Sequence, residues 1–219
     1  MPNNASQSTG VGIDATRLAE RSLMRIERFN VVKPRAASLV LLVTAVDPNG
    51  VAVGASFTLA YTGKLRQARR VSMTINDDDA GGGLAVRAIV TGHRFGVQIV
   101  EELSAVSTDT NDLTVTTSKY FDQVTSVVLK SKTADAGDSV SFGISGAGFG
   151  LPYPIDNVAD VLMIARNNAG TEGQIAVSSS SVDVTNSAII GLTLAAADDY
   201  EVEFKRSHER DGFKLNGVF

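Results

Sequence analysis

The sequence predicts an all-β protein, an antiparallel β-sandwich of immunoglobulin-like or jelly-roll-like form that follows an N-terminal helical arm. After residue 37, short runs rich in Val, Ile, Thr and Phe recur at intervals of roughly 8–14 residues, with alternating apolar and polar positions. Turn-forming clusters of Asp, Asn, Gly and Pro separate these runs, and no helical period lies between them. This pattern favours a sandwich over a parallel α/β sheet.

The N-terminal arm comprises residues 1–36. Residues 2–12 lack any apolar period and are expected to form a tail. Residues 15–29 have apolar positions at spacings of three and four, which predicts an amphipathic helix that Asp14 caps and Pro34 ends. The helix would place an arginine stripe beside its apolar face. A solvated helix face is the favoured interpretation of this stripe, and an acidic surface against it would make it more stable.

The predicted strands fall into two groups. Residues 37–150 form the main sandwich, with strands at 38–46, 51–61, 70–75, 84–90, 96–103, 113–118, 124–130 and 139–144. Residues 151–219 form a C-terminal β-subdomain or complete the same sandwich, with strands at 158–165, 174–178, 182–185, 188–194 and 200–206. Connections are predicted at residues 91–94 and in the Gly-rich stretch 143–150.

The composition excludes several chemistries. The 219 residues include no Cys and two His, so thiol catalysis, disulfides and a Cys/His zinc site are not expected. No apolar run reaches 18 residues and the N-terminus is polar, so neither a spanning helix nor a secretory signal is expected. The net charge of −4 divides into a basic arm and an acidic body, and the small excess on the arm does not predict a nucleic-acid partner.

Several Gly-rich and charged segments approach known motifs without completing them. Residues 143–147 lack the last Gly of a nucleophile elbow, residues 146–150 lack the βαβ context of a dinucleotide fingerprint, and Gly63 and Lys64 lack the rest of a P-loop. Neither His93 nor His208 has an evident partner. A second basic cluster is better explained as a loop that contacts an acidic protein surface, or as a surface without a partner, than as a single-strand binder; it comprises Lys64, Arg66, Arg69 and Arg70.

An acidic run precedes three glycines and offers hard oxygen ligands for Ca²⁺; it comprises Asp77, Asp78 and Asp79. Its spacing does not match the calcium-loop template, which has acids at alternate positions and Gly at the sixth. A solvated β-turn is therefore the favoured interpretation, and no metal or cofactor is predicted.

The middle of the chain resembles small β-sandwich proteins of tailed-bacteriophage particles, in particular capsid decoration or cement proteins. The resemblance spans about residues 69–165, with weaker similarity over 181–206, and its segments are residues 70–74, 82–86, 90–92, 101–103, 117–127, 136–143, 150–152 and 160–162. The family implies an immunoglobulin-like or jelly-roll-like sandwich and no catalytic residues. The chain departs from it in its first 60 residues.

The resemblance implies a non-enzymatic protein that is synthesised in the host cytoplasm and becomes part of the virion at the capsid surface. We expect it to bind across major capsid protein subunits and to form homo-oligomers, because contacts repeated by symmetry are typical of such shells, and we expect no membrane or nucleic-acid partner. The arm would supply the contact residues, which are Arg17, Leu18, Arg21, Arg25, Ile26, Arg28 and Phe29. A tail, neck or fibre component is the alternative; a carbohydrate-binding module is disfavoured because the chain has no Trp and four Tyr.

Overall fold

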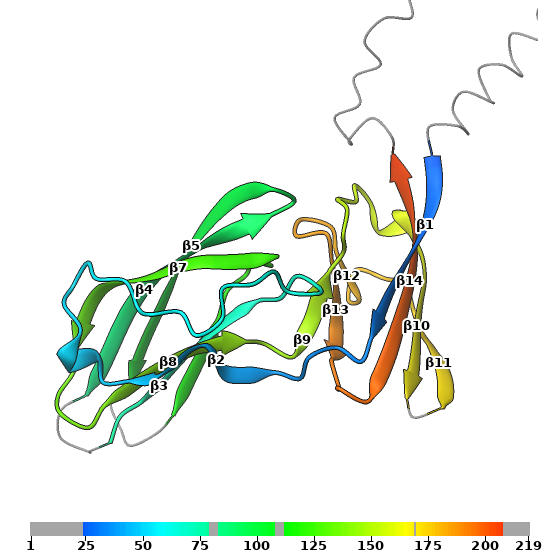
Figure 1. Cartoon of the computed structure of the whole chain (residues 1–219). Coiled ribbons are helices and arrows are strands. Elements are labelled where there is room, and N and C mark those ends of the chain that lie inside the picture. Colours follow the sequence, from blue (N-terminus) through cyan, green and yellow to red (C-terminus); the bar gives the residue numbers. More distant parts are fainter. Residues whose placement is uncertain (1–23, 79–82, 108–111, 169, 208–219) are drawn as a thin grey trace, which may run out of the picture.

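The fold is all-β, and every pairing between its strands is antiparallel. The structure is a computed structural model that describes residues 24–78, 83–107, 112–168 and 170–207. Its strands form four sheets, which are arranged as a larger and a smaller two-layered unit side by side (Figure 1).

The larger unit contains two facing sheets. One has the order β2 (Ser38–Val46), β8 (Ser139–Ile144), β3 (Val71–Asn76) and β6 (Leu113–Thr116). The other has the order β5 (Val97–Ser107), β4 (Leu84–Arg94) and β7 (Gln123–Thr133). Alternate residues of both sheets point inward, because successive side chains of a strand face opposite ways, and they form one buried core that includes Met73, Val90, Val127 and Phe142.

The segment 51–61 is not the continuous strand that the sequence predicts. It follows a short 3₁₀ turn, η1 (Pro48–Gly50), and then runs beside the free edge of β7, where the Gly54 and Phe57 amides donate to the carbonyls of Leu129 and Val127 at 2.7 and 2.8 Å. The Ala60 amide then donates to the carbonyl of Leu42 on β2, in the opposite sheet. The segment therefore crosses between the two layers, which limits its regular pairing to a few residues.

The smaller unit draws on both ends of the described chain. One sheet has the order β1 (Met24–Val32), β14 (Asp198–Ser207), β10 (Val161–Asn168) and β11 (Thr171–Ile175). The second has the order β12 (Val182–Asp183), β13 (Ala188–Thr193) and β9 (Ala147–Gly150), and a 3₁₀ turn, η2 (Val158–Asp160), precedes β10. Their shared core includes Phe149, Ile164, Ile189 and Phe204.

The helix predicted for residues 15–29 is wrong over residues 24–29, which form most of β1; residues 15–23 lie outside the described residues. The deciding contact is the antiparallel pairing with β14, in which Phe29 lies opposite Val202 and Val31 opposite Tyr200. These pairs place apolar side chains on one face at a period of two, and tertiary packing of this kind overrides a short helical pattern.

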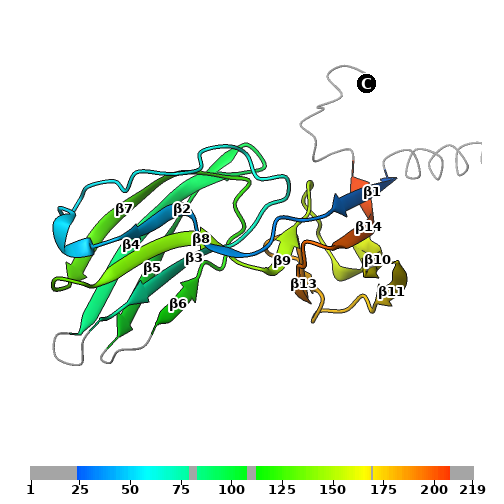
Figure 2. The ribbon, with the colours of Figure 1, turned by 60° about the horizontal axis from the view of Figure 1, so that its bottom comes forward.

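Two further local predictions are corrected. Residues 91–94, predicted as a turn, belong to β4, and the chain reverses at Phe95 and Gly96, whose φ angles of 53° and 76° fit a two-residue hairpin turn. Within the Gly-rich stretch 143–150, residues 147–150 form β9, where Gly148 has a φ of 69°. Figure 2 shows how β9 follows β8 from the larger unit into the smaller one.

Candidate functional site

The predicted contact residues divide between β1 and the part of the chain outside the described residues. Arg25, Ile26, Arg28 and Phe29 lie on β1, which is an edge strand of its sheet, whereas Arg17, Leu18 and Arg21 precede the described residues. Met24 lies opposite Ser207, so the two ends of the described chain leave this sheet side by side (Figure 1).

Arg28, from the predicted arginine stripe, finds its acidic partners within the same chain. Its Nε donates to Glu203 Oε1 at 3.1 Å and lies 3.2 Å from Glu201 Oε1, both on the neighbouring strand β14. The hydrogen bond to Glu203 and the charges of both glutamates raise the pKa of Arg28 above its ordinary value. The expected acidic surface thus includes this chain's own sheet.

The apolar residues of β1 separate onto two faces. Phe29 is half-buried and packs against Phe149, with ring centroids 6.1 Å apart, so it belongs to the core of the smaller unit. Ile26 and Val32 point to the opposite face, where 64% of Ile26 is exposed. Only the outward residues of β1 can therefore meet another molecule, because Phe29 is engaged inside.

The outer face beside β1 is hollowed. A shallow depression of about 530 Å³ lies over β1, β14, β10 and β11, and its lining includes Asn30, Val32, Met163, Arg166, Glu172 and Glu201. Arg166 is held there by buried Asp198, whose Oδ2 accepts from Nε at 2.7 Å and raises the pKa of the guanidinium. The lining combines apolar patches with fixed charges, an arrangement suited to binding a protein surface rather than to acid–base chemistry.

The second basic cluster is divided between structural and exposed roles. Arg69 is buried, and its guanidinium donates to the backbone carbonyls of Ser145 and Arg35 at 2.9 Å each. Burial lowers the pKa of Arg69 to about 10. Arg70 lies over the ring of Tyr120, at 5.1 Å from its centroid. Arg69 therefore stabilises the fold, and it is not available for an external partner.

Arg94 joins the two units, a role that sequence reasoning missed. From the end of β4 its Nη1 donates to Asp122 Oδ1 at 2.8 Å, and its Nη2 donates to the carbonyls of Leu151 and Ser187 in the smaller unit at 2.6 and 3.2 Å. Burial lowers the pKa of Arg94, while Asp122 acts in the opposite direction. Beside it, Ala68 pairs with Gly150 across the junction. This network fastens one unit to the other.

The remaining sequence candidates are placed as follows. Asp77 is buried and accepts a hydrogen bond from the Leu84 amide at 3.1 Å, which fixes the start of β4. Asp79 and His208 lie outside the described residues. His93 lies on β4 and lines a second depression, at the junction, together with Lys64 and Arg66 from the basic cluster. Asp78 meets two acids that the sequence analysis did not single out.

Comparison with protein-family models, curated proteins and solved structures finds no match to this chain. Within the described residues, no helix is long and apolar enough to cross a bilayer. The fold and the surface beside β1 define an antiparallel all-β protein with a candidate binding face, and inferences about its role rest on its own residues.

Proposed function

We propose that the chain is a non-enzymatic structural protein of a tailed-phage particle, most specifically a decoration or cement protein that binds across major capsid subunits and stabilises the shell. The main support is the strand order of the larger unit, which favours the jelly-roll form over the immunoglobulin-like one. The sequence resemblance to phage virion proteins, over residues 69–165, points the same way.

The strand order is informative when the segment 54–57 is counted beside β7. Eight segments then follow β2 to β8 in chain order, and one layer contains the first, eighth, third and sixth. The other layer contains the second, seventh, fourth and fifth. This is the order of a jelly roll, a double-sheet architecture that viral capsid and lectin domains use.

The lectin-type alternative has less support from the surface. Carbohydrate-binding modules stack sugars on exposed aromatic rings. Of the four tyrosines, Tyr120 and Tyr200 are buried in the fold, and Tyr61 and Tyr153 are only partly exposed. The surface thus lacks, among the described residues, a broad aromatic platform.

The outer face beside β1 is the proposed contact with the capsid. Exposed Ile26 lies near the end of β1 from which both chain ends leave, and the depression lies towards the other end of the same strand. A shell presents many equivalent positions, so weak contacts repeated by symmetry would give strong retention. Binding across adjacent subunits would then resist their separation under internal pressure.

Particle fractionation tests the role. Heads and tails of the phage that encodes the chain are separated, and the chain is quantified in each by mass spectrometry against the major capsid and tail proteins. A fixed ratio to the major capsid protein in the head fraction supports the proposal. Absence from particles, or confinement to the tail fraction, overturns the decoration role. Confinement to the tail fraction would instead favour a tail, neck or fibre component.

Variants test the surface. Deletion of residues 1–23 removes the N-terminal segment and keeps β1. The strand must stay because its Val31 is buried in the core of the smaller unit. Ile26→Asp places a charge in the proposed interface and should weaken co-sedimentation with shells at least about tenfold. Val106→Asp, on β5 and 60% exposed, is the matched control and should leave binding unchanged. Weakening by the control alone would refute this choice of surface.

A further inference from the structure

We propose that Asp78, Asp135 and Asp138 form a calcium site at the end of the larger unit that is remote from the junction. Asp78 directly follows the strand β3, and the other two lie in the connection between β7 and β8. Because β3 and β8 are paired, with Asn76 opposite Ser139, the residues after β3 and before β8 meet where these two strands end. The proposal is independent of the proposed function.

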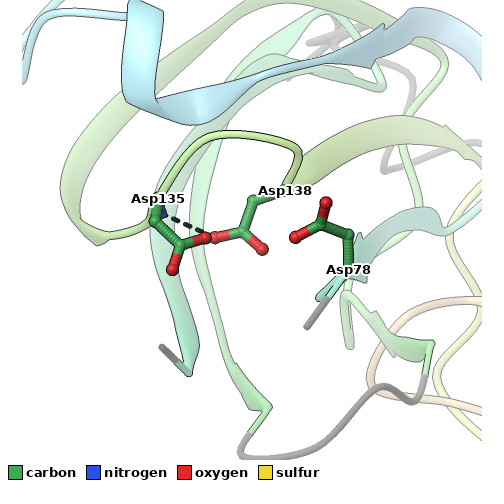
Figure 3. A group of neighbouring side chains, drawn as sticks. All are labelled: Asp78, Asp135 and Asp138. Carbon is green, nitrogen blue, oxygen red and sulfur yellow. Dashed lines mark hydrogen bonds between the residues drawn. The ribbon is translucent and has the colours of Figure 1, made fainter. Parts of the chain in front are cut away.

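The three carboxylates converge on one small volume. Each offers an oxygen, and these oxygens all lie within 4.8 Å of one another. Oxygen ligands lie about 2.3–2.6 Å from Ca²⁺, so two ligands of one ion are at most about 5 Å apart. The separations are therefore compatible with three ligands of one ion. Figure 3 shows Asp138 between the other two.

Asp138 supplies a second observation that points to a cation. Only 2% of this residue is exposed, and its Oδ2 accepts a hydrogen bond from the Asp135 amide at 2.9 Å. Its Oδ1 is buried without a hydrogen-bond partner among the described residues, and it lies on the side of Asp78 in Figure 3. A buried carboxylate oxygen without a partner is costly, and a bound cation removes that cost.

The loop backbone is shaped to admit the third carboxylate. Gly137 has a φ of 107°, in the region that favours glycine, and a Cβ at this position would collide with the carboxylate of Asp78. The connection between β7 and β8 thus leaves room for Asp78 to approach Asp138. Within the described part of the chain, no ion pair joins Asp78 or Asp138 to a Lys or Arg.

The chemistry of the ligands favours a hard divalent cation. Carboxylates from two connections, of which Asp78 is exposed, leave positions for water and suit the flexible coordination of Ca²⁺ better than the strict octahedron of Mg²⁺. A bound ion would tie the connection after β3 to the one before β8. It would stabilise the folded chain by mass action, because the unfolded chain lacks the assembled site.

Calorimetric titration of the EDTA-treated, dialysed full chain with CaCl₂ tests the site, alongside thermal unfolding at constant ionic strength. We expect one bound ion per chain, and a Tm increase of about 5–10 °C at Ca²⁺ a hundredfold above the dissociation constant. MgCl₂ should produce a smaller shift. Absence of binding at millimolar Ca²⁺, or an equal response to both ions, would overturn the proposal.

Two variants and a charge-matched control make the assignment specific. Asp78→Asn alters an exposed side chain and should weaken Ca²⁺ binding at least about tenfold without a lower Tm in EDTA. Asp138→Asn keeps an acceptor for the Asp135 amide and should abolish the Ca²⁺-dependent Tm shift. Glu172→Gln, on exposed β11, removes one charge elsewhere and should bind as the wild type does. Unchanged affinity in both aspartate variants would refute the site.

Discussion

Replacing Arg94 with alanine should lower the free energy of unfolding, because this side chain donates hydrogen bonds to groups in both units. Arg94 is 8% exposed and donates at 2.6 Å to the carbonyl of Leu151, which lies in the smaller unit. Loss of that charge-assisted hydrogen bond costs about 1.5–3 kcal/mol. The carbonyl of Ser187 is less affected, since it also accepts from the Leu151 amide at 2.8 Å.

Two smaller contributions add to this cost. The ion pair with Asp122 contributes up to about 1 kcal/mol, because a third of the Asp122 side chain is exposed and solvent screens it. The guanidinium also lies 3.9 Å from the ring centroid of Phe95, which contributes about 0.5–1 kcal/mol. The expected total loss in the free energy of unfolding is therefore about 2–5 kcal/mol, equivalent to a fall in Tm of at least about 4 °C.

Urea and thermal unfolding of three variants measure the effect. Arg94→Ala should show the full loss and Arg94→Lys an intermediate one, because an ammonium group cannot reproduce the guanidinium's fork of donors. Arg87→Ala is the control, since Arg87 pairs with Glu102 on an exposed face, and it should cost less than about 1 kcal/mol. If Arg94→Ala is no more destabilising than Arg87→Ala, the junction does not depend on Arg94 and the reasoning is refuted.

Three further predictions follow from buried groups and from one surface acid. The buried Tyr120 hydroxyl has no hydrogen-bond partner among the described residues, whereas the Tyr200 hydroxyl donates to the Thr193 carbonyl at 3.1 Å. In urea unfolding, Tyr120→Phe should therefore be neutral or stabilising, and Tyr200→Phe should lower the free energy of unfolding by about 1–2 kcal/mol. The reverse order of the two variants would contradict this account. A Cβ at Gly92 would collide with the backbone of β7, so Gly92→Ala should lower the free energy of unfolding by about 1–3 kcal/mol. Gly173→Ala should not, because its Cβ would make only an ordinary contact with the Arg166 carbonyl oxygen, and equal Tm values for the two variants would argue against the packing. Hydrogen bonds from Lys130 and Arg87 lower the pKa of Glu102, so its contribution to stability is present above the ordinary glutamate pKa and is lost as the pH falls through the lower folded value. Carboxylate NMR titration should place Glu102 below the ordinary value, and a value at or above it would disprove the pairing.

The sequence predicts the strands best where apolar and β-branched residues are dense and turn residues bound them. The range predicted for 38–46 is that of β2, a nearly continuous apolar run, and 139–144 is that of β8, where Val140, Phe142 and Ile144 recur at every second position. Residues 91–94 show the limit of this reasoning. A turn was predicted there from Gly92, yet that glycine lies inside β4, where the close approach of β7 leaves no room for a side chain.

The candidate surface was only partly predictable. Ile26 and Phe29 were assigned to one apolar face because their spacing fits a helix, but on a strand an odd spacing places them on opposite faces. The helical and extended alternatives for this short segment differ little in local free energy. Its pairing with β14, about 170 residues away in the sequence, decides between them.

The sequence by itself determined that this protein is built from antiparallel strands, and it made thiol and Cys/His zinc chemistry untenable. These properties are local or compositional, so they can be recognised without knowledge of any contact. The tertiary structure decided which strand covers β14, how Arg94 reaches across the junction, and that Asp78 meets Asp135 and Asp138. Such groupings arise only when distant segments close around a shared core, because local sequence encodes the shape of each segment but not its partner.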